Sequence, residues 1–347
     1  MDDSVRIGVI GAGAIFRRRH FPALADMSDV EVVAIANRTI ESAQEISDAF
    51  DLGAAVSDDP TVVLNHDDIE AVMIGTWPYK HAEYTIAGLD RNKHVFVQAR
   101  MAASLEEAKE MLHRAEETDL VTQICPSPMG MHGHGVVREL IEDGYLGDLR
   151  FVRGNRISGN RIDPALPIHW RERELYQGIN ALAVGIMMER LHRWTGYARR
   201  VSARTATWIT ERPAHDDDGV VPVDLPNAVT IHCEFENGAL GSFDFSHACS
   251  NNQRNEVSLF GSDGTLVYDF DSDRLMGAKP EDDGLSEIPI LPEDAVEWTV
   301  ERDYIDAVQH GGAPNTTFRE GVRYMEFSEA VCRSAESGSE VRLPIRT

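Results

Sequence analysis

Lysine and cysteine are scarce in this chain of 347 residues. Only four of the 33 basic residues are lysines, and the other 29 are arginines. The four cysteines lie far apart in the sequence, so neither a disulfide framework nor a cysteine-based zinc site is expected. No apolar run approaches the roughly 18 residues of a membrane-spanning helix. These absences argue against a small disulfide-rich protein and against a membrane protein.

Basic residues are few overall: 58 acidic residues outnumber 33 basic ones, which gives a formal net charge of −25. Such a chain repels a phosphate backbone, so nucleic acid is not expected as a partner. Abundant carboxylates with few lysines favour a halophilic source, where concentrated salt screens self-repulsion. An arginine-biased genome with an ordinary acidic protein is the alternative. The acidic start, residues 1–4, lacks the pattern of a secretory signal and indicates a cytoplasmic protein.

Two domains are expected, because the length corresponds to about two units of roughly 150 residues. In residues 1–125, short apolar runs alternate with helical segments. The predicted strands are residues 5–10, 30–36, 54–56, 71–75, 94–98 and 120–125, and the predicted helices are residues 17–27, 41–50, 79–90 and 105–118. This alternation predicts an α/β domain with a doubly wound parallel sheet of the Rossmann type, covered by helices on both faces.

The pattern changes after residue 125, where prolines and glycines interrupt the alternation. One helix, residues 132–143, is predicted before a series of strands at 149–157, 201–209, 227–235, 239–246, 256–260 and 265–270. Asn237-Gly238 and Asp263-Gly264 separate consecutive strands and are typical of hairpin turns. Residues 126–347 are therefore expected to form an α+β domain with a mostly antiparallel sheet.

A Gly-x-Gly sequence stands directly between the first predicted strand and the first predicted helix. Backbone N–H groups at such a place, together with the positive end of the helix, can hold a pyrophosphate. We therefore expect Gly11, Gly13, Ala14 and Ile15 to bind a dinucleotide. Phe16 occupies the position where a third glycine or alanine is usual, so the motif is incomplete. A merely tight structural turn is the alternative.

The end of the second predicted strand is where a dinucleotide-binding domain selects the ribose. Residues 36–39 contain no acid that could bind the 2′-hydroxyl of NAD. Arg38 is well placed for a 2′-phosphate, so NADP is the favoured cofactor. The alternative is a solvated Arg38, with Asn37 serving the ribose of NAD.

Short segments spread over nearly the whole chain resemble those of the Gfo/Idh/MocA family, which includes glucose-fructose oxidoreductase and inositol dehydrogenase. They are residues 7–13, 76–81, 92–97, 147–149, 236–239, 260–266 and 330–335. The resemblance implies a Rossmann domain, hydride transfer between a nicotinamide and a carbohydrate-like hydroxyl, and a substrate-binding second domain that forms a dimer or tetramer. It also implies that Thr76, Trp77, His81 and Gln98 line the cofactor.

Three positions depart from the pattern of this family. The family's Glu-Lys-Pro after the fifth strand is replaced by Gln98-Ala99-Arg100, so the usual lysine amine is missing. An Asp and a His four residues apart on a helix correspond here to Ala183 and Met187. Because a methyl group and a thioether cannot accept a proton, the usual mechanism cannot run unchanged.

Other side chains must then handle the proton of the reacting hydroxyl. His169 and Tyr176 are proton carriers, and Asn180 is expected to share a helical face with the two vacated positions, three and seven residues further on. Arg100 lies beside the missing lysine and can fix an oxyanion, although it cannot act as a base near neutral pH. These four are the candidate catalytic residues. Packing or surface roles are the alternative for each, and Lys80 is an alternative source of the missing amine.

Three functions remain open at this point. The leading one is an NAD(P)-dependent oxidoreductase with unusual acid/base residues and a small carbohydrate-like substrate. The loss of three acid/base side chains also allows an inactive ligand-sensing or regulatory protein. The third is a lyase or glycosidase that reduces and reoxidises a bound nicotinamide in every cycle. No metal site is expected, because His132 and His134 lie two apart on a predicted helix and point in different directions.

Overall fold

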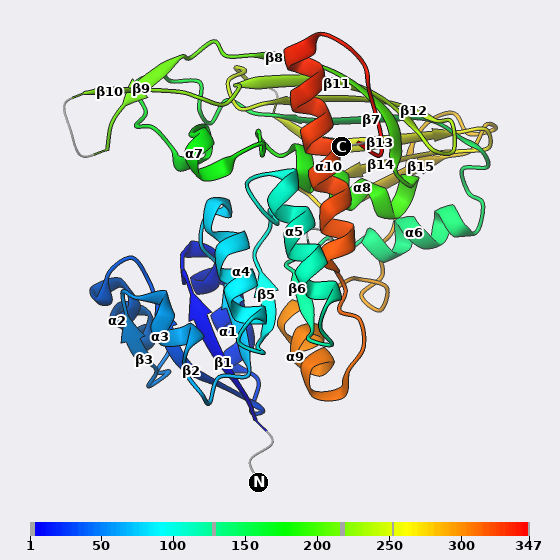
Figure 1. Ribbon diagram of the computed structural model, residues 1–347. Helices are drawn as coiled ribbons and strands as arrows, with labels where there is room; N and C mark the ends of the chain where they lie inside the picture. Colours follow the sequence, from blue (N-terminus) through cyan, green and yellow to red (C-terminus); the bar gives the residue numbers. More distant parts are fainter. Residues whose placement is uncertain (1–3, 127–129, 216–218, 252, 346–347) are drawn as a thin grey trace. The chain divides into compact units, whose positions relative to one another are not determined.

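The computed structural model describes residues 4–126, 130–215, 219–251 and 253–345 (Figure 1). Residues 1–3, on which the predicted location rests, lie outside the described residues. Contacts divide the chain into two compact units. Unit 1 comprises residues 1–126 and 299–322, and unit 2 comprises residues 127–298 and 323–347.

Unit 1 is built on a six-stranded sheet in the order β3-β2-β1-β4-β5-β6, in which every pairing is parallel. The strands are β1 (Val5–Ile10), β2 (Val30–Ala36), β3 (Ala55–Ser57), β4 (Ala71–Ile74), β5 (His94–Val97) and β6 (Thr122–Ile124). Strand β4 is buried throughout, as expected for a parallel strand covered on both faces. The predicted doubly wound sheet is confirmed, and its strand order reverses between β1 and β4, where such sheets bind ligands.

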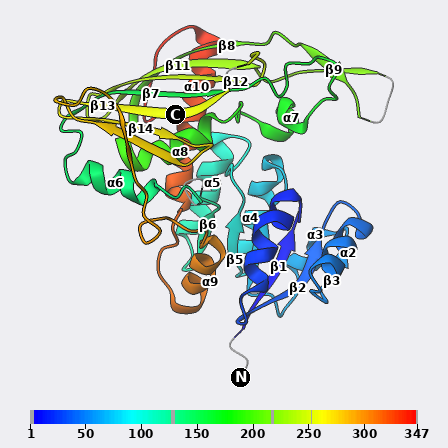
Figure 2. The ribbon, with the colours of Figure 1, turned by 180° about the vertical axis from the view of Figure 1, so that it is seen from behind.

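Helices flank this sheet: α2 contacts β2 and β3, and α3 contacts β1 and β2 (Figures 1 and 2). They are η1 (Phe16–His20), α1 (Phe21–Ala25), α2 (Ile40–Ala49), α3 (Pro60–Leu64), η2 (Pro78–Lys80), α4 (His81–Leu89), α5 (Leu105–Glu116) and α9 (Val300–His310). Side chains cap several of them: the Thr39 hydroxyl accepts the N–H of Ser42 at the start of α2, at 3.2 Å. The helix predicted over residues 17–27 is instead a π-helical turn followed by one short α-helix. Pro22 lacks an N–H, so the hydrogen-bond ladder is interrupted there.

Residues 299–322 complete unit 1, although the division expected from the sequence places them in the second domain. The ring of Tyr304 in α9 is fully buried and packs against Phe96 of β5, with 5.6 Å between ring centroids. The carbonyl of Thr316 accepts the N–H of Ile124 in β6 at 3.0 Å. The late segment therefore covers the β5 and β6 side of the parallel sheet. Helix α10 (Phe318–Ser337) then leads into unit 2.

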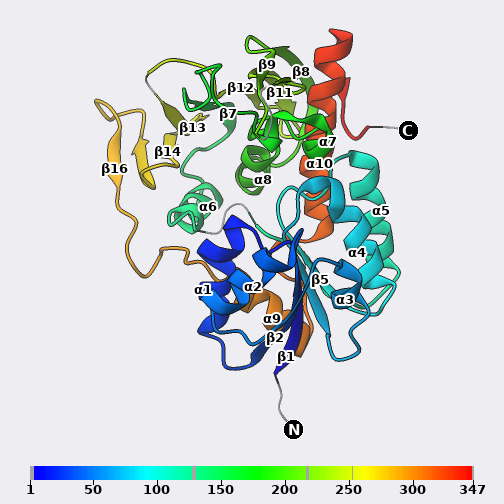
Figure 3. The ribbon, with the colours of Figure 1, turned by 90° about the vertical axis from the view of Figure 1, so that its left-hand side faces the viewer.

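Unit 2 is built on a nine-stranded sheet in the order β16-β15-β14-β13-β7-β12-β11-β8-β17. Figure 3 shows β16 on the outer side of this sheet, beyond β14 and β13. The strands are β7 (Leu149–Ile157), β8 (Ala198–Ala206), β11 (Ala228–Phe235), β12 (Leu240–Ser246), β13 (Arg254–Gly261), β14 (Thr265–Asp269), β15 (Arg274–Ala278), β16 (Ser286–Ile288) and β17 (Val341–Arg342). All pairings are antiparallel except that of β7 with β12. The predicted mostly antiparallel sheet is thus confirmed, with hairpins at Asn237-Gly238 and Asp263-Gly264.

The remaining elements of unit 2 are α6 (His134–Glu142), η3 (Trp170–Glu172), α7 (Glu174–Gln177), α8 (Val184–Thr195) and a small hairpin of β9 (Glu211–Pro213) with β10 (Val220–Pro222). The Ser334 hydroxyl of α10 accepts the N–H of Ala203 in β8 at 2.9 Å, which fastens α10 to the sheet. Gly185 lets α8 approach α10, because a methyl group there would lie 3.1 Å from the Tyr324 ring. Among the described residues, no helix is long and apolar enough to span a membrane.

Candidate functional site

The glycine turn after β1 has a backbone that only glycine accommodates at its first position. Gly11 has φ +83°, and a methyl group there would lie 2.6 Å from the backbone nitrogen of Thr76. Its own N–H donates to the carbonyl of Ala36 at the end of β2, at 2.8 Å. The turn therefore lies close against the ends of both neighbouring strands.

The second glycine of the turn faces open space. A methyl group on Gly13 would meet only the carbonyl oxygen of Gly11, at 4.0 Å. Ala14 is exposed and Ile15 is half-buried, and both open the helix that follows. The first N–H groups of a helix have no partner inside it, so they are available to an anion. The open approach and these N–H groups together fit a dinucleotide diphosphate.

Phe16 shows how the missing third glycine is tolerated. Its ring is fully buried and lies against Gly75, the residue that follows β4. A methyl group on Gly75 would come within 2.3 Å of the Phe16 ring. The space that the usual motif creates with its third glycine is thus created by Gly75, and sequence reasoning about the turn alone did not identify it.

Asn37 and Arg38 follow β2 and have different tasks. The side-chain oxygen of Asn37 accepts the N–H of Ala12 at 2.7 Å and so ties the glycine turn to the end of β2. Arg38 is exposed, and its guanidinium carbon lies 5.2 Å from the ring centroid of Trp77. This cation–π contact places a positive charge beside the ends of β2 and β4.

His81 lies inside unit 1 and joins two loops. One ring nitrogen is 2.9 Å from the carbonyl of Thr76, and the other is 2.8 Å from the carbonyl of Arg100 and 3.2 Å from that of Met101. The side chain is 1% exposed, and burial lowers its pKa from the ordinary value. Because both nitrogens face backbone carbonyls, the ring holds the loops after β4 and β5 together.

Two more predicted residues follow β5. Gln98 is half-buried, and its side-chain oxygen lies 3.1 Å from Nε2 of His20. Arg100 is only 5% exposed, so the guanidinium beside the predicted lysine position is not a surface group. Lys80, the alternative amine, is paired with Glu83 at 2.6 Å on the surface of the chain.

His169 begins η3 in unit 2 as its N-terminal cap. Nδ1 accepts the N–H of Arg171 at 3.2 Å, and the backbone N–H of His169 donates to Glu172 at 2.9 Å. Burial, and next the positive charges of Arg171 and Arg161, lower the pKa of His169 to about 4. The ring is therefore neutral at pH 7. With the Nδ1 lone pair engaged, its hydrogen lies on Nε2, so His169 presents a hydrogen-bond donor.

Glu172 fixes the segment that carries His169, and no pattern in the sequence identified this residue. Its carboxylate is 2% exposed and pairs with Arg161 at 2.6 Å and with Arg212 at 2.8 Å. Arg212 is fully buried and also donates to the carbonyls of Asp163 and Arg161, at 2.7 and 2.5 Å. Partners 40 residues apart leave no local pattern in the sequence.

The expectation that Asn180 shares a helical face with Ala183 and Met187 is wrong. Helix α8 begins only at Val184, because Leu182 adopts φ +48° and Ala183 is the cap residue. Asn180 lies in the preceding turn, 3% exposed, and donates through its side chain to the carbonyl of Gln177 at 2.6 Å. A spacing rule for one helix cannot apply across this break.

Tyr176 lies in the short helix α7 and is half-buried. Ala183 and Met187, at the two positions predicted to have lost acid/base groups, are 8% and 1% exposed. Among the described residues, no group of three or more His, Cys, Asp or Glu side chains is arranged to hold a metal ion.

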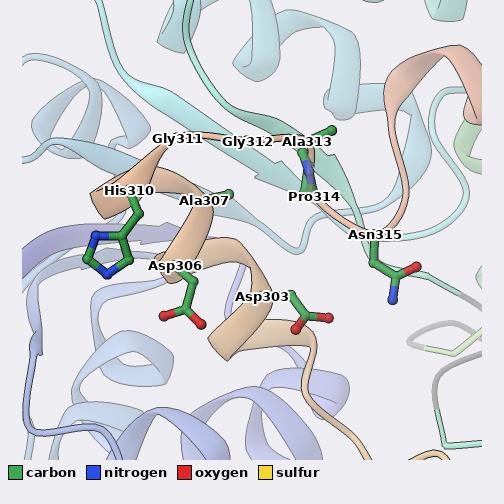
Figure 4. Close-up of a pocket in the computed structure, with 9 residues that line it drawn as sticks. All are labelled: Asp303, Asp306, Ala307, His310, Gly311, Gly312, Ala313, Pro314 and Asn315. Atoms are coloured by element: carbon green, nitrogen blue, oxygen red, sulfur yellow. The ribbon is translucent and has the colours of Figure 1, made fainter.

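A surface pocket of about 550 Å³ lies elsewhere on unit 1, at the end of α9 and the loop after it (Figure 4). Its carboxylates have partners: Asp306 pairs with Arg302 at 2.8 Å, and Asp303 accepts from Thr299 at 3.1 Å. None of the residues predicted from the sequence to bind cofactor or substrate lines it. We therefore assign it no part in the predicted chemistry.

Known proteins match the chain over nearly its whole length. The levoglucosan dehydrogenase of Pseudarthrobacter phenanthrenivorans is 26% identical, covering 98% of this chain and 98% of its own. The scyllo-inositol 2-dehydrogenase (NADP(+)) of Bacillus subtilis is 23% identical, covering 98% and 96%. The solved structure of levoglucosan dehydrogenase in complex with NADH and levoglucosan superposes with a TM-score of 0.89 at 24% identity, covering 98% of this chain and 99% of that one.

Family models agree with these matches. One described as "Oxidoreductase family, NAD-binding Rossmann fold" matches residues 5–125, and one described as "GFO/IDH/MocA C-terminal domain" matches residues 134–267. The resemblance seen in the sequence motifs is thereby confirmed. This chain belongs to the Gfo/Idh/MocA family of oxidoreductases.

Proposed function

We propose that this protein is an NAD(P)-dependent dehydrogenase or reductase that acts on a hydroxyl or keto group of a sugar, polyol or related small molecule. The glycine turn carries the proposal, because Gly11 fits only without a side chain and Gly13 faces open space at the start of a helix. The names of the relatives, a levoglucosan dehydrogenase and a scyllo-inositol 2-dehydrogenase, support the substrate class.

The nicotinamide, when bound, supplies or accepts the hydride. Gly11, Gly13, Ala14 and Ile15 would hold the diphosphate through backbone N–H groups. Thr76 and Trp77 would line the cofactor at the end of β4, as Gln98 would at the end of β5. His81 supports the binding loops from inside, because its ring nitrogens face their carbonyls.

Four side chains are proposed to handle the reacting oxygen. His169 offers an N–H donor, since its Nδ1 already accepts a backbone N–H. Tyr176 is the proposed proton carrier, and the Asn180 amide orients a hydroxyl. Arg100 stabilises negative charge on oxygen without taking a proton.

NADP is the proposed preference, because Arg38 is the charged residue at the end of β2 and is held beside Trp77. We expect Arg38→Ala to weaken NADPH binding about 10- to 100-fold, the effect of losing a charged hydrogen bond, and to leave NADH binding nearly unchanged. Calorimetric titration with both nucleotides measures this. Arg91→Ala is a matched control, because Arg91 bonds Asn65 elsewhere on unit 1. An equal loss for both nucleotides contradicts the preference for NADP.

A turnover assay tests the function as a whole. Purified protein in molar KCl, as the acidic composition suggests, is incubated with NAD or NADP and a panel of sugars and polyols. Steady accumulation of reduced cofactor is expected. Nucleotide or sugar binding without turnover would favour a sensing or regulatory protein, and a product without net reduced cofactor would favour a lyase or glycosidase with a recycled nicotinamide.

A homo-oligomer is also proposed, formed through the sheet of unit 2. Leu240, Phe151 and Phe260 stand side by side on β12, β7 and β13, and the two phenylalanine rings lie 6.3 Å apart. Leu240 is 54% exposed and Phe260 is 37% exposed. We expect Phe260→Arg to shift a dimer or tetramer toward monomer in sedimentation analysis, whereas Leu285→Arg, on an exposed loop residue, leaves it unchanged. A monomeric wild-type protein would refute the proposal.

A further inference from the structure

Three polar side chains of unit 1 form a hydrogen-bonded chain that is buried at His20 and Glu301 and ends at the half-buried Gln98. His20 is the last residue of η1, Gln98 follows β5, and Glu301 is in the first turn of α9. Nδ1 of His20 is hydrogen-bonded to the Glu301 carboxyl, and Nε2 lies 3.1 Å from the side-chain oxygen of Gln98. His20 and Glu301 are 0% and 1% exposed. Three segments far apart in the sequence thus meet at the carboxyl end of β5.

The chemistry of the two side chains determines which one donates in the hydrogen bond between His20 and Gln98. The Gln98 oxygen can only accept, so Nε2 of His20 must carry the hydrogen between them. This holds whether the proton between His20 and Glu301 belongs to the imidazole or to the carboxyl group. The imidazole therefore acts as a donor to Gln98 in both cases, and Glu301 makes that possible.

Aromatic rings hold the imidazole in place. The His20 ring lies 4.5 Å from the Phe16 ring and 5.3 Å from the Phe96 ring, measured between centroids, and the Phe96 contact is edge-on. Phe16 and Phe96 are themselves fully buried. With the imidazole fixed and its hydrogen aimed at Gln98, the amide of Gln98 has its oxygen turned inward and its two N–H donors turned away from His20.

We propose that His20 and Glu301 are positioning residues, which hold the Gln98 amide so that its N–H group donates to an oxygen of the bound ligand. This inference rests on the proposed function. The acceptor is an oxygen of the nicotinamide half of the cofactor or the reacting oxygen of the substrate. In both cases an amide N–H stands beside Ala99, the position predicted to have lost the lysine amine. An amide can orient an oxygen but cannot relay a proton.

Two sets of variants test the proposal. Gln98→Ala removes the donor. His20→Phe combined with Glu301→Leu removes the anchor and replaces both members of the His20–Glu301 pair by apolar groups, so that neither is left buried without the other. The measurements are the dissociation constant for NADH and NADPH by calorimetry, kcat and KM for the substrate, and thermal unfolding as the check on folding.

We expect Gln98→Ala and the double variant each to lose about tenfold, the effect of one hydrogen bond to a ligand. The loss falls on the nucleotide dissociation constant if the acceptor is on the cofactor, and on kcat/KM at unchanged nucleotide affinity if it is on the substrate. Adding Gln98→Ala to the double variant should cost nothing more, because an unanchored amide no longer contributes. This coupling is not expected if His20 and Glu301 only support the fold.

Losses that multiply in the triple variant, or a double variant that binds and turns over like wild type, overturn the proposal. If the double variant does not fold, Gln98→Glu tests whether Gln98 acts as a hydrogen-bond donor to the ligand. Its carboxylate keeps the bond from His20 but presents no donor, so it should lose as much as Gln98→Ala, and full function in Gln98→Glu refutes a donor role. A wild-type protein that binds neither nucleotide refutes the proposed function itself, a result distinct from all of these.

Discussion

Replacing Gly13 by valine is expected to weaken NADH and NADPH binding at least about 100-fold while leaving the free energy of unfolding unchanged. The space around Gly13 is open, so the fold tolerates the side chain, but a branched side chain there blocks the approach of a diphosphate to the helix N-terminus. Calorimetric titration gives the affinity, and denaturant unfolding gives the stability. A valine variant that binds nucleotide as tightly as wild type would mean that this turn holds no diphosphate.

Gly11→Ala provides the contrast within the same turn. Here the left-handed backbone costs about 1–2 kcal/mol, and the new methyl group collides with the backbone of Thr76 in addition. We expect a loss of about 2–4 kcal/mol in the free energy of unfolding, accompanied by loss of nucleotide binding. Gly53→Ala separates the two causes, because Gly53 has φ +60° but open surroundings, so only the backbone cost remains.

The fold of unit 1 was predictable because each of its buried strands is a short apolar run and each turn follows from local chemistry. The strand over residues 5–10 and the glycine turn after it are properties of adjacent residues. Whether Phe16 is compatible with that turn depends on Gly75, almost sixty positions later. A motif read by itself cannot show such a compensation, since the two residues meet only in the folded sheet.

Residues of the candidate site were predictable only where their distance in sequence from a strand or a glycine turn determines their place in the fold. Arg38 and Asn37 were found because they follow a strand at a fixed place in a Rossmann fold. Helical spacing puts Asn180 on a helix that in fact begins four residues later, because the positive φ of Leu182 ends the regular pattern and a leucine gives no sequence signal of it. The partnership of His20 with Glu301 joins residues 281 positions apart and was beyond any local pattern.

Glu172 also has a partner far away in the sequence, since Arg212 lies 40 positions later. Its replacement has the largest expected effect on stability. Glu172→Gln leaves Arg212, which is fully buried, without its carboxylate, and Arg161 loses the same partner. Removing one member of a buried ion pair costs about 3–5 kcal/mol, because the remaining charge stays desolvated. We expect a loss of that size near pH 7 in denaturant unfolding. Glu142→Gln, which removes the partner of Arg138 in a solvent-exposed helical pair, should cost at most about 0.5 kcal/mol.

The pH dependence of the Glu172 effect separates charge from packing. Burial raises the pKa of this carboxyl, but the hydrogen bonds from Arg161 and from the His169 backbone outweigh it and hold the pKa below its ordinary value of 4.5. The carboxylate's contribution is therefore fully present above that ordinary value and is lost as the pH falls through the lowered one. The difference in stability between wild type and Glu172→Gln should be constant from pH 8 to about pH 5 and shrink in more acidic solution. A difference that persists unchanged in acid would mean that Glu172 stabilises the segment carrying His169 through its shape rather than its charge.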